Sequence, residues 1–353
     1  MNRLDASMIE AQAATLSELY REDLPALIRN AAHAEVPGGI RRVYALGNGD
    51  SYHAALAARQ YFAQWTEIEY LPMPAYTFWS KELPRLAPDW AAEALIVCIS
   101  ASGSSKLAAD ILIRAGEKGF PTLSLAGRKN CAMDQAARYT LSAGIREKGR
   151  SPGIRTFAAS LGGLFALACR LSGQAGRMER LAVQLEESAQ GIEAILAAAR
   201  PLAREAAAWD WPHAMVLGCD GLLGCASFAA AKLAEGCGVL AVPQEMEEWC
   251  HVESMTYPLN APVIILQGGA ADRAQAIKAA KTARRAGRPV LLWGELPDAE
   301  LAGCAQQYVC VGPGCEEALL PLFAYLPVLP LACALAERLG RAMFLSDQPF
   351  SLF

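Results

Sequence analysis

Histidine is scarce in this chain, with four in 353 residues, and none of the eleven cysteines is spaced as a CxxC pair. A structural zinc site is therefore not expected, because such sites use closely spaced Cys and His ligands. Excess positive charge is also missing, since the formal net charge is -4 and the pI is about 5.7. We therefore do not expect nucleic acid as a partner.

The N-terminal residues, MNRLDASMIEAQ, lack the apolar stretch of a signal peptide. The cysteines lie among apolar or small residues, as buried thiols do, so we expect a cytoplasmic protein. Prolines at 321, 327 and 330 interrupt the apolar segment 318–336. We expect a buried strand followed by a helix there, and no membrane partner.

Short apolar segments alternate with helical segments along the chain. We predict strands at residues 42–46, 68–71, 95–99, 121–125, 139–142, 213–218, 263–267, 290–293 and 308–311. We predict helices at residues 5–34, 157–171, 178–208 and 270–286. Strands that are joined through helices form parallel sheets by right-handed crossovers. The predicted fold class is therefore α/β, with two similar αβα units in tandem.

One predicted strand runs directly into a serine-rich turn, LIVCISASGSSK at residues 95–106. The first backbone N–H groups of the helix after it are unpaired and carry partial positive charge. Hydroxyls gathered at such a place, here on Ser100, Ser102, Ser104 and Ser105, favour an anion such as phosphate. The alternative is a helix cap, which needs only one serine.

The predicted strands 42–46 and 213–218 end in similar Gly-rich turns, GNGDSYHAA and GCDGLLGCA. Each turn leads from a strand into an alanine-rich helix. The second half has no counterpart of the serine-rich turn, because Leu266 is followed by QGGAADRA. We therefore expect one phosphate site per chain.

The chain resembles the double SIS (sugar isomerase) domain proteins in the order and spacing of three motifs. These are GNGDSYHAA, SASGSS after a predicted strand, and KLAE followed by EEWCHVE. That family includes the isomerase half of glucosamine-6-phosphate synthase and the deglycases of 6-phosphorylated Amadori compounds. The resemblance implies two tandem three-layer αβα SIS domains, each with a parallel flavodoxin-like sheet. Residues 1–200 would hold the leading helix and the phosphate-binding turn. Residues 201–353 would hold a catalytic Glu and His and a C-terminal tail that includes DQP at 347–349.

The resemblance assigns phosphate binding to the serine-rich turn. Ser100, Ser102 and Ser105 match the family's hydroxyl positions, with Ser105 in place of a threonine. Ala101 replaces a frequent glutamine, so we expect one side-chain contact to be missing. Hydroxyls and backbone amides suit a dianion because they donate hydrogen bonds without a fixed charge.

The first Gly-rich turn is the second place where the resemblance implies substrate contacts. Ser51 matches a further phosphate-binding serine, and Gly49 and Asp50 match positions that line the sugar. The alternative for Ser51 is again a helix cap. A single GxG pattern is weak evidence of any function by itself.

Glu235 and His251 are sixteen residues apart, the separation at which the family places its proton-transferring base and its ring-opening histidine. Glu235 ends an apolar helix, AAAKLAE, where partial burial would raise its pKa toward the range useful for proton transfer. His251 lies among glutamates, which would hold its proton or fix its tautomer. In relatives this histidine reaches the neighbouring subunit's site, which implies a homodimer. The alternatives are a solvated glutamate and a surface ion-pair histidine.

Three further residues are matched to substrate-binding positions. Lys232 corresponds to a sugar-binding lysine, although a helical ion pair with Glu235 is the alternative. Glu147 and Arg155 lie in AGIREKGRSPGIRTF, which resembles a loop that closes over substrate. This loop is one residue longer than in the family and has Arg155 in place of a lysine, and the alternative is a polar surface loop.

The departures from the family narrow the expected activity. The chain starts Met1-Asn2 and offers no glutaminase domain, and its tail, DQPFSLF, lacks the imine-forming lysine, so we do not expect glutamine-dependent amide transfer. We expect a cofactor-independent deglycase or deaminating isomerase that converts a 6-phosphorylated amino-ketose to an aldose 6-phosphate and an amine or amino acid. The alternatives are an aldose–ketose phosphate isomerase and a non-catalytic sugar-phosphate sensor.

Overall fold

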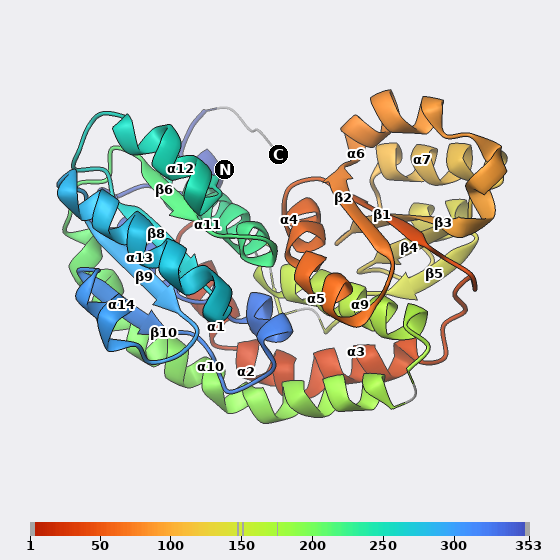
Figure 1. Cartoon of the computed structure of the whole chain (residues 1–353), viewed down its shortest axis with the longest axis horizontal. Helices are drawn as coiled ribbons and strands as arrows, with labels where there is room; N and C mark the ends of the chain where they lie inside the picture. Colours follow the sequence, from red (N-terminus) through yellow and green to blue (C-terminus); the bar gives the residue numbers. More distant parts are fainter. Residues whose placement is uncertain (1–3, 147, 150–151, 175, 350–353) are drawn as a thin grey trace. The chain divides into compact units, whose positions relative to one another are not determined.

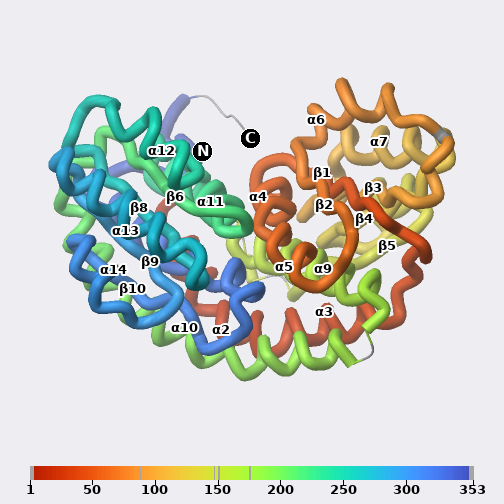
Figure 2. Tube along the Cα trace, viewed as in Figure 1, coloured from red at the N-terminus to blue at the C-terminus, as the bar shows by residue number. Residues whose placement is uncertain are grey.

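The computed structural model describes residues 4–146, 148–149, 152–174 and 176–349. They form two compact units, each built on one parallel five-stranded sheet. We call them the first-sheet unit, Glu18–Glu147 and Arg155–Glu187, and the second-sheet unit, Met1–Ser17, Lys148–Ile154 and Ser188–Phe353. In Figures 1 and 2 the strands of the first-sheet unit are orange to yellow and those of the second-sheet unit are green to blue.

The sheet of the first-sheet unit has the strand order β2-β1-β3-β4-β5, and all pairs are parallel. Its strands are β1 (Arg42–Gly47), β2 (Glu69–Pro74), β3 (Ala94–Ser100), β4 (Thr122–Ala126) and β5 (Tyr139–Ser142). Its helices are η1 (Leu19–Asp23), α3 (Leu24–Ala31), α4 (Asp50–Ala57), α5 (Arg59–Trp65), α6 (Ala75–Thr77), η2 (Phe78–Glu82), η3 (Leu83–Arg85), η4 (Pro88–Glu93), α7 (Lys106–Glu117), α8 (Ala132–Ala136) and α9 (Ile154–Leu171).

The second sheet repeats this topology with the order β10-β9-β8-β6-β7, again fully parallel. Its strands are β6 (Ala214–Leu217), β7 (Ala241–Gln244), β8 (Val263–Gln267), β9 (Val290–Gly294) and β10 (Gln307–Cys310). Helices of this unit are α1 (Ser7–Ala13), α11 (Gly221–Cys237), α12 (Met246–His251), η5 (Glu253–Met255), α13 (Gly269–Arg285), α14 (Ala299–Gly303), η6 (Glu317–Leu322), α15 (Val328–Leu339) and η7 (Met343–Leu345). The helices α2 (Leu16–Glu18) and α10 (Arg177–Ala207) have residues in both units, as does α9 through its first residue, Ile154.

Both sheets are covered by helices on their two faces, as the predicted three-layer αβα fold requires (Figure 1). The central strands are apolar and buried along nearly their whole length, which is typical of parallel strands with helices on both sides. The order is that of a flavodoxin-like sheet, in which the first and third strands of the unit are neighbours. The predicted fold is therefore confirmed.

Side-chain alternation along β6 shows which helices cover which face of the second sheet. Met215 and Leu217 pack in one core cluster with Met246 and Trp249 of α12 and with the alanines of α13. The helix α11 has no residue in that cluster, and it packs instead against β6, β7 and α15. The helices α12 and α13 therefore cover one face of the sheet, and α11 and α15 cover the other.

Some predicted elements differ from the observed ones. The strand β7 was not predicted: it is short, contains Pro243 and lies at the sheet edge, where a missing N–H costs no ladder hydrogen bond. The strand expected in 318–336 is wrong, because the segment forms η6 and α15. The predicted helix 5–34 is divided into α1, α2, η1 and α3. The predicted division into 1–200 and 201–353 stays a prediction, and its boundary falls inside α10.

The helix α9 is long and apolar enough to cross a membrane by length and composition alone. Within the structure 83% of its residues are buried. Phe165 on this helix stacks on Tyr61 of α5, with ring centroids 4.1 Å apart. These contacts are those of a core helix.

Candidate functional site

The turns after β1 and β3 lie at the same edge of the first sheet. The two strands are hydrogen-bonded neighbours, with Leu46 opposite Cys98, so their carboxyl ends are adjacent. The chain leaves β1 toward β2 on one side and returns to β3 on the other, and open α/β sheets bind ligands at this switch point. The structure thus brings the two predicted substrate turns together.

The serines of the second turn hold its backbone in place. Ser100 Oγ accepts from Gly103 N at 3.1 Å, and Ser105 Oγ accepts from Ala108 N at 3.3 Å as the cap of α7. Ser102 Oγ lies 2.8 Å from Ser104 Oγ. The cap expected as the alternative for Ser105 is therefore present. A hydroxyl that accepts a backbone hydrogen bond can still donate its own proton, so capping and phosphate binding are compatible.

Gly103 is required by the shape of this turn. Its φ is +65°, a value that L side chains rarely adopt. A Cβ at this position would lie 2.4 Å from Cys131 Sγ. The serine-rich turn is therefore packed closely against the chain before α8, and its conformation depends on the glycine.

The first turn brings the start of α4 close to the end of β1. A Cβ on Gly47 would lie 2.6 Å from the backbone carbon of Ser51, so only glycine allows this approach. Gly49 has a φ of +51° and precedes Asp50, the first residue of α4. Asp50 and Ser51 are both partly buried. These positions border the switch point, where the resemblance places sugar and phosphate contacts.

His53 also belongs to this edge, although the sequence analysis assigned it no role. Its Nδ1 lies 3.7 Å from Asp50 Oδ1, one helical turn away, and its side chain is only 17% exposed. The signal that could have identified it is the i, i+3 spacing from Asp50 at a helix start. The structure thus places an imidazole and a carboxylate side by side next to the first predicted substrate turn.

Lys232 and Glu235 form an ion pair on α11 in the second-sheet unit. Lys232 Nζ lies 2.5 Å from Glu235 Oε2, and the lysine side chain is 1% exposed against 32% for the glutamate. Lys232 also donates to the carbonyl of Pro152 and lies over the Phe228 ring. The expected helical ion pair is therefore present. Pro152 belongs to the predicted substrate loop, so the Lys232–Glu235 pair lies next to that loop. The exposed part of the Glu235 carboxylate remains open to solvent there.

His251 ends α12 and is 67% exposed. Its Nε2 lies 3.1 Å from Glu247 Oε1, and Glu247 also pairs with Lys278 Nζ at 2.6 Å. The hydrogen bond from Lys278 keeps the pKa of Glu247 below its usual value. The carboxylate next to His251 therefore remains charged and orients the ring, and the other side of the imidazole faces solvent.

Glu235 and His251 lie on opposite faces of the second sheet. Glu235 is near the end of α11, which packs with α15 on one face, and His251 is on α12, which packs with α13 on the other. Two layer spacings of roughly 10 Å each separate the outer helices of such a fold. Proton transfer requires contact within about 3 Å. One chain therefore does not bring its own Glu235 and His251 to the same reacting carbon.

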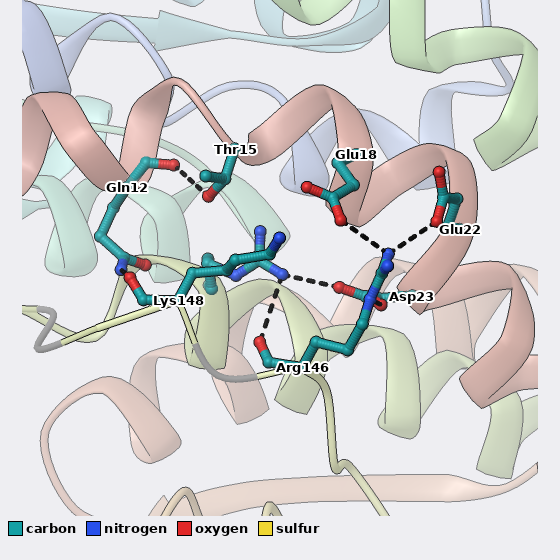
Figure 3. A network of polar contacts seen from close by, with 8 residues as sticks. Gln12, Thr15, Glu18, Glu22, Asp23, Arg146 and Lys148 are labelled. Carbon is teal, nitrogen blue, oxygen red and sulfur yellow. Dashed lines mark hydrogen bonds and ion pairs between the residues drawn. The ribbon is translucent and has the colours of Figure 1, made fainter.

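Arg155 has a structural partner. Its side chain is 3% exposed, and its Nη2 lies 2.6 Å from Asp23 Oδ2. The neighbouring Arg146 binds the same carboxylate and also Glu18 and Glu22 (Figure 3). This ion-pair cluster accounts for a charged residue at position 155, and the substrate-binding role of Arg155 stays a prediction. Glu147 lies outside the described residues.

The corresponding switch point of the second sheet is lined with carboxylates. Gly269 N, at the start of α13, donates to Glu295 Oε2 at 2.7 Å, and a Cβ on Gly269 would lie 2.3 Å from Glu317. Burial, and then the charges of Glu317 and Asp220, raise the pKa of Asp272 to about 6. Negative charge at this edge disfavours a phosphate, and one phosphate site per chain stays a prediction.

The comparisons with known proteins agree with this architecture. Residues 39–162 match the family model described as the SIS domain. The glutamine–fructose-6-phosphate aminotransferase [isomerizing] of Streptococcus pyogenes serotype M1 is 24% identical over 176 residues, which are 49% of this chain and 27% of that protein. The chain thus spans about a quarter of the length of the curated relatives it matches.

Two solved structures share the fold over nearly the whole chain. The tagatose-6-phosphate ketose/aldose isomerase of Escherichia coli superposes with a TM-score of 0.74 at 14% identity, covering 97% of this chain and 96% of that one. The glucosamine-6-phosphate deaminase of Thermotoga maritima gives 0.67 at 16% identity, covering 93% and 94%. Residues 39–162 therefore contain a SIS domain by sequence, and the chain as a whole shares its fold of two flavodoxin-like sheets with these solved structures.

Proposed function

We propose that the protein is a cofactor-independent deglycase or deaminating isomerase that acts on a 6-phosphorylated amino-ketose. The observation that carries this proposal is the retention of the Lys232–Glu235 pair next to Pro152 together with a serine-rich turn at the switch point of the first sheet. A protein that only senses a sugar phosphate needs the turn alone. A partly exposed carboxylate such as that of Glu235 can act as a general base when the substrate lies within hydrogen-bond reach.

The chemistry assigns a separate task to each group. Ser51, Ser100, Ser102 and Ser105 donate hydrogen bonds to the phosphate and fix the sugar at its far end. The Glu235 carboxylate takes a proton from C1 while the C2 carbonyl oxygen gains one, which gives an enaminol. Return of a proton to C2 forms the C1 imine. Water then adds at C1, the C–N bond breaks, and an amine and an aldose 6-phosphate leave.

His251 supports ring opening from a second copy of the chain in this proposal. Six exposed apolar residues lie within eleven positions of it in the sequence, with Met255 71% and Tyr257 82% exposed: Leu240, Val242, Val252, Met255, Tyr257 and Leu259. We call this group the patch. The patch lies along β7, the edge strand of the sheet, and the segment after α12. Exposed apolar side chains and an unpaired strand edge are both typical of protein contacts. A homodimer would cover them and carry His251 to the partner's site.

The test is a panel of 6-phosphorylated fructosamines that carry different amines, with released amine and aldose 6-phosphate measured in parallel. We expect turnover without added metal or cofactor, abolished by Glu235→Gln and unaffected by the control Glu193→Gln, an exposed glutamate on α10. Full turnover by Glu235→Gln would overturn the mechanism. Interconversion of ketose and aldose phosphates without amine release would favour the simple isomerase. Stabilisation by glucose 6-phosphate without turnover would favour a sensor.

A further inference from the structure

A hollow of about 430 Å³ lies in the second-sheet unit between α1, α10 and α15. None of the residues predicted to bind substrate lines it. Its volume is within the range of small-molecule sites in proteins. We call it the α1–α15 pocket.

The floor of the α1–α15 pocket is apolar. Ile9 of α1 and Leu329 of α15 are fully buried there, next to Leu196 of α10. Cys333 completes the floor, and its thiol donates to the Ala6 carbonyl at 3.5 Å. Burial raises the pKa of Cys333 to about 12, so the thiol is neutral and behaves as a small apolar group. The floor therefore favours an apolar ligand group.

Positive charge lines one side of the pocket. Arg200 and Arg204 are four residues apart on α10 and therefore lie on one face of the helix. Among the described residues, neither guanidinium has a hydrogen bond or an ion pair with a carboxylate within 4.0 Å. Arg273 of the same unit, in contrast, lies 2.6 Å from Asp298. Two unneutralised guanidinium groups at this spacing can bind one carboxylate in common.

Negative charge lines the pocket from two other helices. Glu10 of α1 and Glu337 of α15 have no ion pair in the part of the chain that the structure describes. Opposite charges on three helices thus surround a shared apolar floor, and in the described part of the chain these four groups form no ion pair with one another within 4.0 Å. Asp5 and Arg341 also line the pocket. A molecule with both charges and an apolar group would satisfy all three surfaces together.

We propose that the α1–α15 pocket binds a free amino acid with an apolar side chain. The carboxylate pairs with Arg200 and Arg204, the ammonium group faces Glu10 and Glu337, and the side chain covers Cys333 and its apolar neighbours. The site is separate from the switch point of the first sheet, and the proposal does not depend on the proposed function. If the deglycase activity holds, such an amino acid is of the same chemical class as one of its products.

The test is isothermal titration of the full chain with L-leucine, in the absence of any sugar phosphate. We expect saturable binding that is lost with N-acetyl-leucine, which has no ammonium group, and with leucinamide, which has no carboxylate. The double variant Arg200→Gln/Arg204→Gln should bind leucine about tenfold or more weakly. The control Arg338→Gln changes an exposed arginine of α15 outside the pocket lining and should bind as the wild type does.

Absence of leucine binding to the wild-type chain would overturn the proposal. Equal binding of leucine and N-acetyl-leucine would also overturn it, because the ammonium group would then have no role. Unchanged affinity in the double variant, with the thermal unfolding midpoint also unchanged, would show that leucine binds elsewhere. None of these outcomes depends on whether the chain turns over a phosphorylated fructosamine.

Discussion

Two inactive variants of this protein should restore activity to each other when they are mixed. Glu235 and His251 lie on opposite faces of the second sheet, about 20 Å apart by the layer spacing. The proposed mechanism therefore needs Glu235 from one copy of the chain and His251 from another. Glu235→Gln alone removes the base from every site, and His251→Asn alone removes the ring-opening group from every site. Each homodimer should therefore be nearly inactive.

A heterodimer of the two variants contains one intact site. It combines Glu235 from the His251→Asn chain with His251 from the Glu235→Gln chain, while its other site carries both changes. Random exchange of subunits makes half of the dimers heterodimers, so the mixture should recover about a quarter of the wild-type turnover. The assay is amine release after the two chains are unfolded together and refolded, with the dimer fraction measured by native mass spectrometry.

The result that refutes this reasoning is a mixture that contains heterodimers and keeps only the activity of its parents. That outcome would mean that both residues act in the same chain or that His251 has no catalytic role. Mixing Glu235→Gln with wild-type chain is the matched control. It should only dilute activity in proportion to the variant added.

Three further changes test other parts of the structure. Asp272→Asn should raise the free energy of unfolding, measured in urea, by about 1–2 kcal/mol above pH 6 and by little near pH 4. The pKa of Asp272 is raised in the folded state, so the folded protein loses stability as this carboxyl ionises between about pH 4 and about pH 6. A difference that does not depend on pH would contradict this. Gly103→Ala should lower the free energy of unfolding by about 1–3 kcal/mol and weaken binding of glucose 6-phosphate, because the new Cβ lies against Cys131 and the residue has a positive φ. The control Gly116→Ala in α7 places its Cβ in open space and should leave stability unchanged or raise it. Arg155→Gln should lower the free energy of unfolding by about 3 kcal/mol, since it leaves Asp23 with one partner fewer; an unchanged thermal midpoint with a raised KM would instead assign Arg155 to substrate binding.

The sequence predicted the sheets well because parallel strands leave a clear apolar pattern. Residues 95–99 and 263–267 are continuous apolar segments, and both are buried strands. The edge strand β7 left no such pattern, since Ala241–Gln244 is partly exposed and contains a proline. Local periodicity therefore identifies the centre of a sheet more readily than its edge.

Local contacts in the candidate site were predictable where the residues are close in sequence, although their roles in binding and catalysis stay predictions. The serine-rich turn and the Lys232–Glu235 pair are each local, and the structure shows the expected cap and ion pair. The partner of Arg155 was not predictable, because Asp23 is 132 residues away and their contact depends on the tertiary fold. The placement of Glu235 and His251 on different faces follows from the strand order, which spacing along the chain does not reveal.

The Glu295 carboxylate, which accepts a hydrogen bond from Gly269 N, has a consequence for anion binding at the second sheet. The Glu295 carboxylate is part of the chain, so its effective concentration at the start of α13 is in the millimolar range or higher. It therefore competes with any free anion for the backbone N–H groups at that helix start. We expect a phosphate analogue to saturate at one equivalent per chain, and Glu295→Gln to weaken the block on the second domain. The second sheet thus presents its own carboxylate at the place where the first sheet presents serine hydroxyls.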